Sequence, residues 1–154
     1  MHFEHLRKTA WYPTFEWVKT SLACATKINS YHEDYPKYVE ATGIALGHSP
    51  DISNNHLLSI HRLIFSDKSF AGKFRGMDVR VGTHQPPRTF EVMNMMTQLE
   101  SLYHILTIDD VIEWYKDFET IHPFQDGNGR VGGVIVAGYA HKLQPDKGWL
   151  APNQ

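Results

Sequence analysis

The stretch from His122 to Arg130 constrains this chain of 154 residues more than any other part of it. Pro123 disfavours helical geometry at the preceding residue, so a helix arriving through residues 110–120 should stop near the histidine and leave its imidazole in a loop. A Gly-Asn-Gly sequence then opens a second helical pattern over residues 130–141. The sequence therefore predicts a helix, a short loop and a second helix, with the chemically versatile residues in the loop.

The start of the second helix has the features of an anion site. Unpaired backbone N–H groups at a helix start bind phosphates with help from the helix dipole, and here they belong to Gly127, Asn128 and Gly129. Arg130 follows in the first turn, where its guanidinium can brace the same phosphates. Asp126 would repel phosphate unless a divalent cation lay between them, which implies Mg²⁺.

His122 completes the set, because an imidazole with a near-neutral pKa beside a bound phosphate can act as general base for a hydroxyl nucleophile. Taken singly, a histidine is more often a structural residue, and Asp-Gly-Asn-Gly is more often an ordinary turn. Their joint occurrence between two helical patterns favours a nucleotidyl-transfer site.

Residues 122–130 resemble the signature of Fic-domain proteins, HPFxDGNGRxxR, at every defined position through Arg130. The resemblance implies a mainly α-helical Fic fold, a compact helical bundle with one β-hairpin called the flap. It also implies Mg²⁺-dependent transfer of AMP from ATP to a Ser, Thr or Tyr hydroxyl of a protein. In that comparison His122 resembles the catalytic base, Asp126 the Mg²⁺ ligand, residues 127–129 the anion nest and Arg130 a phosphate contact.

The chain departs from the family pattern at two positions. Gly133 stands where the second arginine of the signature contacts the γ-phosphate, a loss of roughly 1.5–3 kcal/mol of binding if nothing replaces it. Asn29 aligns with the glutamate of the family's autoinhibitory helix, which pairs with that arginine. Three alternatives therefore stay open: a nucleotide-binding pseudoenzyme, a transferase using UTP or CDP-choline, and a toxin-like protein controlled by a partner.

Residues 74–82 combine alternating β-branched residues with glycines, which predicts a small hairpin. The segment resembles the Fic flap, along which a target protein adds a strand. Residues expected to position the substrate are Arg75, Val79, Arg80 and Val81, and Arg75, Arg80 or Arg88 could replace the missing arginine.

Composition excludes some partners. A net charge of −2 implies no general attraction to nucleic acid or anionic membranes. The single cysteine, Cys24, cannot form an intrachain disulfide and indicates a reducing compartment. The polar start of the chain does not resemble a signal peptide, so we expect a cytoplasmic protein. Self-association is left open.

The length suits one domain, residues 1–154, with a core over about 15–145, an arm at 1–13 and a tail at 145–154. His56 and His61 lie five apart, poorly spaced for shared metal binding on a helix, and are interpreted as structural or surface residues. Glu119 and His122 have the spacing of a carboxylate-bridged metal site, but no second such pair faces them. Apolar periodicity predicts helices over residues 14–30, 37–46, 52–67, 89–104 and 109–121.

Overall fold

The computed structural model describes residues 7–8, 12–13, 40, 44–45 and 50–144. Four helices have defined bounds within these residues: α4 Asn54–Ile64, α5 Thr89–Leu102, α6 Ile108–Ile121 and α7 Asn128–Leu143. Each of them corresponds to a helix that the sequence predicts, with ends shifted by up to three residues. The mainly α-helical fold is therefore confirmed.

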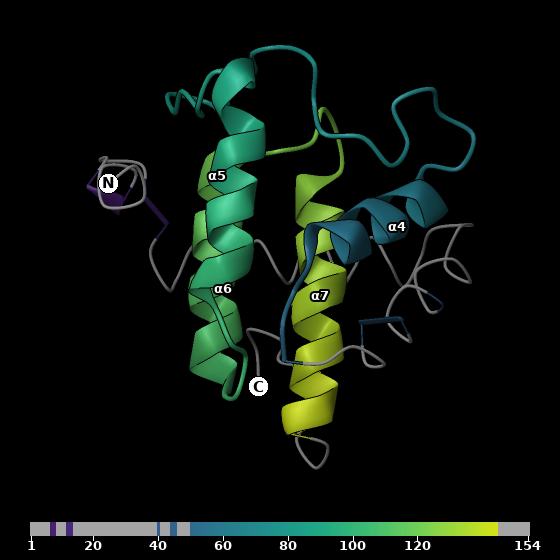
Figure 1. Ribbon diagram of the computed structural model, residues 1–154, viewed down its shortest axis with the longest axis vertical. Helices are drawn as coiled ribbons and strands as arrows, with labels where there is room; N and C mark the ends of the chain where they lie inside the picture. Colours follow the sequence, from purple (N-terminus) through teal and green to yellow (C-terminus); the bar gives the residue numbers. More distant parts are fainter. Residues whose placement is uncertain (1–6, 9–11, 14–39, 41–43, 46–49, 145–154) are drawn as a thin grey trace.

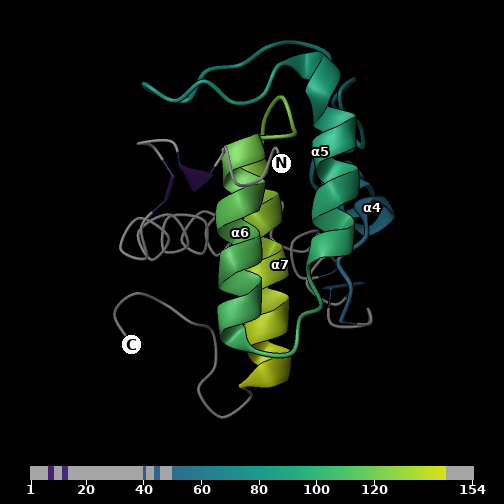
Figure 2. The ribbon, with the colours of Figure 1, turned by 60° about the vertical axis from the view of Figure 1, so that its left-hand side comes forward.

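The helices form a small bundle. α5, α6 and α7 run along the long axis of the molecule, and α4 crosses it beside α7 (Figure 1). α6 packs against both α5 and α7, while α4 contacts α5 and α7. Figure 2 shows α6 in front of α7, with the loop that joins them at one end of the bundle. That loop is the 122–127 segment, so the predicted site lies at the end of the bundle.

Aromatic side chains of α6 and α7 fill the centre of the bundle. Trp114 and Phe118 stack with their ring centroids 4.8 Å apart, and both are inaccessible to solvent. Phe124, in the loop, is also fully buried. Burying rings of this size contributes about 1.5–3 kcal/mol each, so the loop is anchored to the core by its own phenylalanine.

Side-chain caps set the helix starts. The Ser53 hydroxyl accepts a hydrogen bond from the His56 N–H, which starts α4 after residue 53. The Thr107 hydroxyl accepts from the Asp110 N–H while the Asp110 carboxylate accepts from the Thr107 N–H, a reciprocal capping box that starts α6. Caps of this kind contribute about 1 kcal/mol each and determine boundaries that hydrophobic periodicity leaves undefined.

The flap segment is less regular than predicted. Over residues 74–84 the structure contains one isolated antiparallel bridge, between Val81 and His84, and no strand ladder. Side chains hold the segment instead: the Asp78 carboxylate accepts from the Thr89 N–H at the start of α5, and the Gln85 amide donates to the Val79 carbonyl. The contact from Gln85 takes up a backbone carbonyl that a hairpin could have paired.

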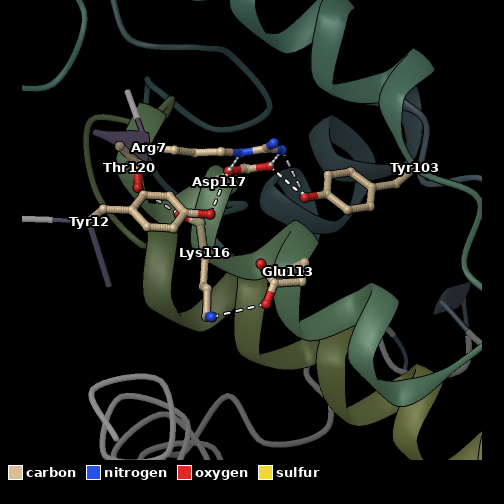
Figure 3. Close-up of polar contacts among 7 residues, drawn as sticks. All are labelled: Arg7, Tyr12, Tyr103, Glu113, Lys116, Asp117 and Thr120. Carbon is tan, nitrogen blue, oxygen red and sulfur yellow. Dashed lines mark hydrogen bonds and ion pairs between the residues drawn. The ribbon is translucent and has the colours of Figure 1, made fainter. Parts of the chain in front are cut away.

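A buried ionic cluster ties the N-terminal arm to α6 (Figure 3). Asp117 is 1% exposed, and its carboxylate accepts two hydrogen bonds from Arg7, at 2.6 and 3.0 Å. The hydroxyl groups of Tyr12 and Tyr103 donate to the same carboxylate at 2.8 and 2.6 Å. Burial, together with the charge of Asp117, raises the pKa of both tyrosines, so they remain hydrogen-bond donors. Arg7 and Tyr12 are thus joined to α6 at a residue five positions before His122.

Some predictions lie outside the described residues. They are the helix at 14–30, which includes Asn29, and the tail at 145–154. Of the helix expected at 37–46, residues 40, 44 and 45 are described, and all three are helical. Among the helices that the structure describes, none has both the length and the apolar character needed to cross a membrane.

Candidate active site

His122 ends α6 in an unusual backbone conformation. Its φ of 54° and ψ of 61° place it in the left-handed region, and its N–H donates to the Phe118 carbonyl at 3.0 Å. Among the described residues it is the one non-glycine residue with positive φ. Such a conformation costs about 1–2 kcal/mol and is seldom retained without a reason. The helix therefore stops where the sequence predicts, and the imidazole projects from the turn.

Two side chains of the flap segment secure this helix end. Arg75 donates to the carbonyls of Ile121 and His122 at 3.2 and 2.7 Å. His84 Nε2 lies 2.9 Å from the Thr120 carbonyl oxygen, which can only accept, so Nε2 donates. The last carbonyls of a helix need such donors, and a cation there also complements the dipole. Arg75 and His84 thus hold the backbone that carries the imidazole.

The expected ligand-binding role of Arg75 is wrong. Its remaining guanidinium contacts are the carbonyls of Met77 and Pro87 at 2.9 and 2.6 Å and the Thr89 hydroxyl at 3.4 Å. The residue is only 4% exposed. Because its donors are engaged inside the protein, Arg75 is not placed to replace the missing second arginine of the signature.

The environment of His122 keeps its imidazole neutral. The ring is half-buried, and its Nδ1 atom is enclosed without a hydrogen-bond partner in the part of the chain that the structure describes. Burial, reinforced by the positive charge of Arg75 and by His84, lowers the pKa of His122 to about 4. A base must be unprotonated to accept a proton, and this histidine is unprotonated at neutral pH. Its pKa nevertheless lies below the near-neutral value expected from the sequence, because the ring is enclosed.

An NMR pH titration is expected to show the ring of His122 neutral from pH 8 down to about pH 5, with a midpoint near 4. The unfolded chain, with a histidine pKa of about 6.5, is the internal control. Since the unfolded state then binds more protons between pH 6.5 and 4, His122 lowers the stability of the fold as the pH falls through that window. A native midpoint of 6 or above would contradict the enclosure of the ring.

Two packing contacts fix the loop after His122. The side-chain amide of Asn128 accepts from the Phe124 N–H at 2.9 Å and donates to the Phe124 carbonyl at 2.8 Å, closing the loop on itself. Gly127 has a φ of 84°, and a Cβ atom there would lie 2.3 Å from the ring of Phe65, the residue directly after α4. Glycine is required at 127 on both counts, by its backbone conformation and by its contact with the ring.

The start of α7 presents unsatisfied donors. Gly127 is its N-cap and supplies no side-chain cap. The first backbone bond into the helix runs from the Val131 N–H to the Gly127 carbonyl, and the N–H groups of Asn128 and Gly129 meet no acceptor within the described chain. These groups and the helix dipole are what the predicted anion site would use, and the site itself stays a prediction. The side chain of Asn128 is buried, so only its backbone can serve this site.

Asp126 and Arg130 flank this helix start. Their side chains are 60% and 27% exposed and approach to 3.7 Å, a weak ion pair between residues four apart. The Arg130 guanidinium also lies 4.7 Å from the centre of the Phe65 ring. Within the described residues no group of three or more His, Cys, Asp or Glu side chains could hold a metal by itself. Asp126 is thus a single exposed oxygen donor next to the anion site.

Glu119 is a buried acid that the sequence did not single out for this environment. Desolvation raises its pKa to about 8, although a hydrogen bond with Tyr115 opposes the shift, and its Oε1 atom has no partner in the described part of the chain. The unfolded chain would ionise this group near 4.5, so Glu119 lowers the stability of the fold as the pH rises from 4.5 to 8. A neutral carboxyl does not suit the dinuclear-metal alternative.

The other predicted site residues are more scattered. Arg80 is exposed, Val79 and Val81 are half-buried on the flap segment, and Gly133 is buried inside α7. Arg88 forms an exposed ion pair with Asp78 at 2.7 Å. Residues 122 and 126–130 therefore lie in one loop and the helix start that follows it. The flap residues lie elsewhere, and the side chains of Arg75 and Arg88 contact other groups.

Sequence reasoning missed three residues that shape the loop: His61, Phe65 and His84. His61 and Phe65 lie at the end of α4, and His84 lies in the flap segment, all distant from residue 122 in sequence. From the sequence alone, a phenylalanine and two histidines at these positions predict burial and nothing more specific. The only signal available was that histidines buried in a core need polar partners, which in this chain are the backbone carbonyls of Asp126 in the loop and of Thr120 at the end of α6.

The structure is thus a helical bundle in which a neutral histidine ends one helix and free N–H groups open the next. The Fic/DOC family model matches residues 51–139, which is more than half of the chain. The chain belongs to the Fic/DOC family.

Two curated relatives illustrate the similarity. The chain is 32% identical over 110 residues to "Protein adenylyltransferase Fic" of Aedes aegypti, which covers 65% of this chain and 21% of the relative. It is 32% identical over 124 residues to the protein of the same name from Drosophila melanogaster, which covers 71% of this chain and 24% of the relative. The chain therefore spans less than a quarter of the length of these relatives.

Solved structures share the fold. A Fic domain-containing signaling protein from Bacteroides thetaiotaomicron superposes with a TM-score of 0.63 at 20% identity, over 73% of this chain and 48% of that one. A Fic family protein from Desulfovibrio desulfuricans gives a TM-score of 0.60 at 16% identity, over 94% of this chain and 55% of that one. At these identities the likeness establishes the Fic fold.

Proposed function

We propose that this protein transfers AMP from ATP to a hydroxyl group of a target protein. The observation that carries the proposal is the neutral imidazole of His122, held at one end of a short loop whose other end is the open start of α7. The relatives named protein adenylyltransferase support the same reaction. Each part of the loop has a role in such a transfer.

The chemistry follows from the residues. His122 accepts the proton of the target hydroxyl, whose oxygen then bonds to the α-phosphorus of ATP. The bond from that phosphorus to the oxygen bridging to the β-phosphate breaks, and pyrophosphate leaves. The N–H groups of Asn128 and Gly129 stabilise the negative charge on the phosphate oxygens, and Arg130 can turn from Phe65 toward them.

The residues present fit a magnesium ion. The Asp126 carboxylate is an exposed, hard oxygen donor beside the anion site, and Mg²⁺ characteristically combines one or two carboxylates with water and substrate phosphates. Bound there, the ion would neutralise phosphate charge. Asp126 would hold it, and the weak contact with Arg130 is readily given up.

The target segment would dock along the flap. The backbone around the exposed Arg80 is outside any strand ladder, and it lies in the segment whose residues Arg75 and His84 hold the end of α6. A strand added there would bring its hydroxyl toward His122 with little dependence on side-chain identity. We place the reaction in the cytoplasm, in keeping with the single cysteine.

Gly133 supports a second candidate, a transferase with another donor. A buried glycine offers no side chain to a γ-phosphate, and Arg75 does not replace it. CDP-choline has no γ-phosphate and would lose less from this change than ATP, and UTP would do so if its triphosphate were bound differently. The same substitution motivates the pseudoenzyme alternative, in which a nucleotide binds without transfer.

The test offers the purified protein labelled ATP, UTP, GTP, CTP and CDP-choline in turn, with cell lysate and Mg²⁺. We expect labelled protein from ATP, and none after chelation of the metal or in the His122→Ala variant. Label from CDP-choline or UTP alone would show that this compound is the donor and that ATP is not. Nucleotide binding without label from any donor would establish the pseudoenzyme and exclude the transferase.

A further inference from the structure

His61 on α4 makes contacts that reach the loop of the candidate active site. The residue is fully buried, and both of its ring nitrogens are engaged. The Gly72 N–H donates to Nδ1 at 2.9 Å, so Nδ1 must carry a lone pair. Nε2 therefore carries the hydrogen and donates it to the Asp126 carbonyl at 3.0 Å. The two contacts select one tautomer and point its single N–H at the loop.

The ring is also fixed in orientation. It stacks on Phe124 with ring centroids 4.0 Å apart and an angle of 9° between the planes, and it touches Phe65 at 4.7 Å. Phe65 in turn presses against Gly127 and lies under the guanidinium of Arg130. The end of α4 thus supports the loop along its length, with His61 meeting the backbone of Asp126.

That contact falls where the loop needs support. Gln125 and Asp126 are the exposed residues of the turn, between Phe124, which Asn128 clamps, and Gly127, which packs on Phe65. A carboxylate is directed by the backbone that carries it, and metal ligands depend on such supporting hydrogen bonds for their geometry. Release of the Asp126 carbonyl would let the carboxylate swing away from the start of α7.

We infer that His61 is a positioning residue for the metal- and phosphate-binding loop: its Nε2–H fixes the Asp126 backbone so that the carboxylate stays beside the free N–H groups of α7. The inference rests on the proposed function, since it concerns the same site. It goes beyond the signature residues, because His61 belongs to another helix and touches neither metal nor nucleotide.

Two variants separate positioning from bulk stability. His61→Gln places an amide nitrogen near the position of Nε2 and can still donate to Asp126, whereas His61→Asn places an oxygen near Nδ1 and keeps the Gly72 contact alone. Both lose the stacked ring. We expect ATP titrated calorimetrically with Mg²⁺ to bind His61→Asn about 10–100-fold more weakly than wild type, and His61→Gln within a few-fold of it. Their melting temperatures should fall by similar amounts.

The controls keep the outcomes apart. His104→Asn alters an exposed histidine paired with Asp51 and should change neither affinity nor melting temperature. Equal affinity loss in the two His61 variants would overturn the inference while leaving the proposed function standing. Absence of Mg²⁺-dependent ATP binding by the wild type would overturn both.

A measurement on the wild type covers the case in which the variants do not fold. Nitrogen-15 NMR of the imidazole is expected to show His61 protonated at Nε2 and unprotonated at Nδ1. The opposite tautomer would remove the hydrogen bond to Asp126 and with it the inference.

Discussion

Replacement of His122 by asparagine is expected to reduce the proposed transfer about 10²–10⁴-fold, the usual contribution of a positioned general base. Asparagine tolerates the left-handed conformation that residue 122 adopts, with its φ of 54°, so this variant should fold. Its amide cannot accept the hydroxyl proton at neutral pH. The initial rate of labelled transfer is the measurement, with the dissociation constant for the Mg²⁺ nucleotide beside it.

The rate of transfer should fall while the dissociation constant for the nucleotide stays unchanged. We expect the variant to bind nucleotide as the wild type does, because the binding groups belong to residues 126–130 and not to the imidazole. His104→Asn, on the surface, serves as the matched histidine control. Transfer at the wild-type rate in the asparagine variant would disprove the assignment of His122 as base.

Asp117→Ala is expected to lower the free energy of unfolding by about 1.5–3 kcal/mol, the range for losing hydrogen bonds to a charged group, because Asp117 is buried whereas the Arg7 side chain is 38% exposed. The change leaves the Arg7 guanidinium and the hydroxyls of Tyr12 and Tyr103 without the acceptor they share (Figure 3). Urea unfolding followed by circular dichroism gives the free energy, and an unchanged m-value would show that the transition is comparable.

A pair on the same helix supplies the control. Glu113 and Lys116 approach to 3.0 Å near the surface of α6, with the Glu113 side chain half-exposed. Glu113→Ala should change the free energy of unfolding by less than about 0.5 kcal/mol. If Asp117→Ala cost no more than this control, the cluster would not be what joins the arm to α6.

Much of the architecture was predictable because helices depend on residues that are close together in the sequence. The spacing of apolar residues placed α4 to α7, and Pro123 and the glycines placed the break between α6 and α7. Residues 122–130 predicted the site for the same reason, since the histidine, the acid and the helix start are neighbours in sequence. Helix starts were misplaced by up to two residues where a cap such as Ser53 decides the boundary.

The rest was not predictable because it depends on contacts between distant segments. Arg75 looked like a ligand-binding arginine, yet it satisfies carbonyls at the end of α6, which only the folded chain brings to it. The flap pattern predicted a hairpin, but Asp78 and Gln85 hold that segment with their side chains. His61 showed no sign in the sequence of its link to Asp126, 65 residues away.

The backbone twist at residue 122 bears on whether this protein is a working enzyme. Glycine would adopt a φ of 54° at little cost, whereas histidine holds it against a penalty of about 1–2 kcal/mol. Strained backbone of this kind is concentrated at active sites, so the conformation of His122 agrees with a role for its ring in the proposed transfer.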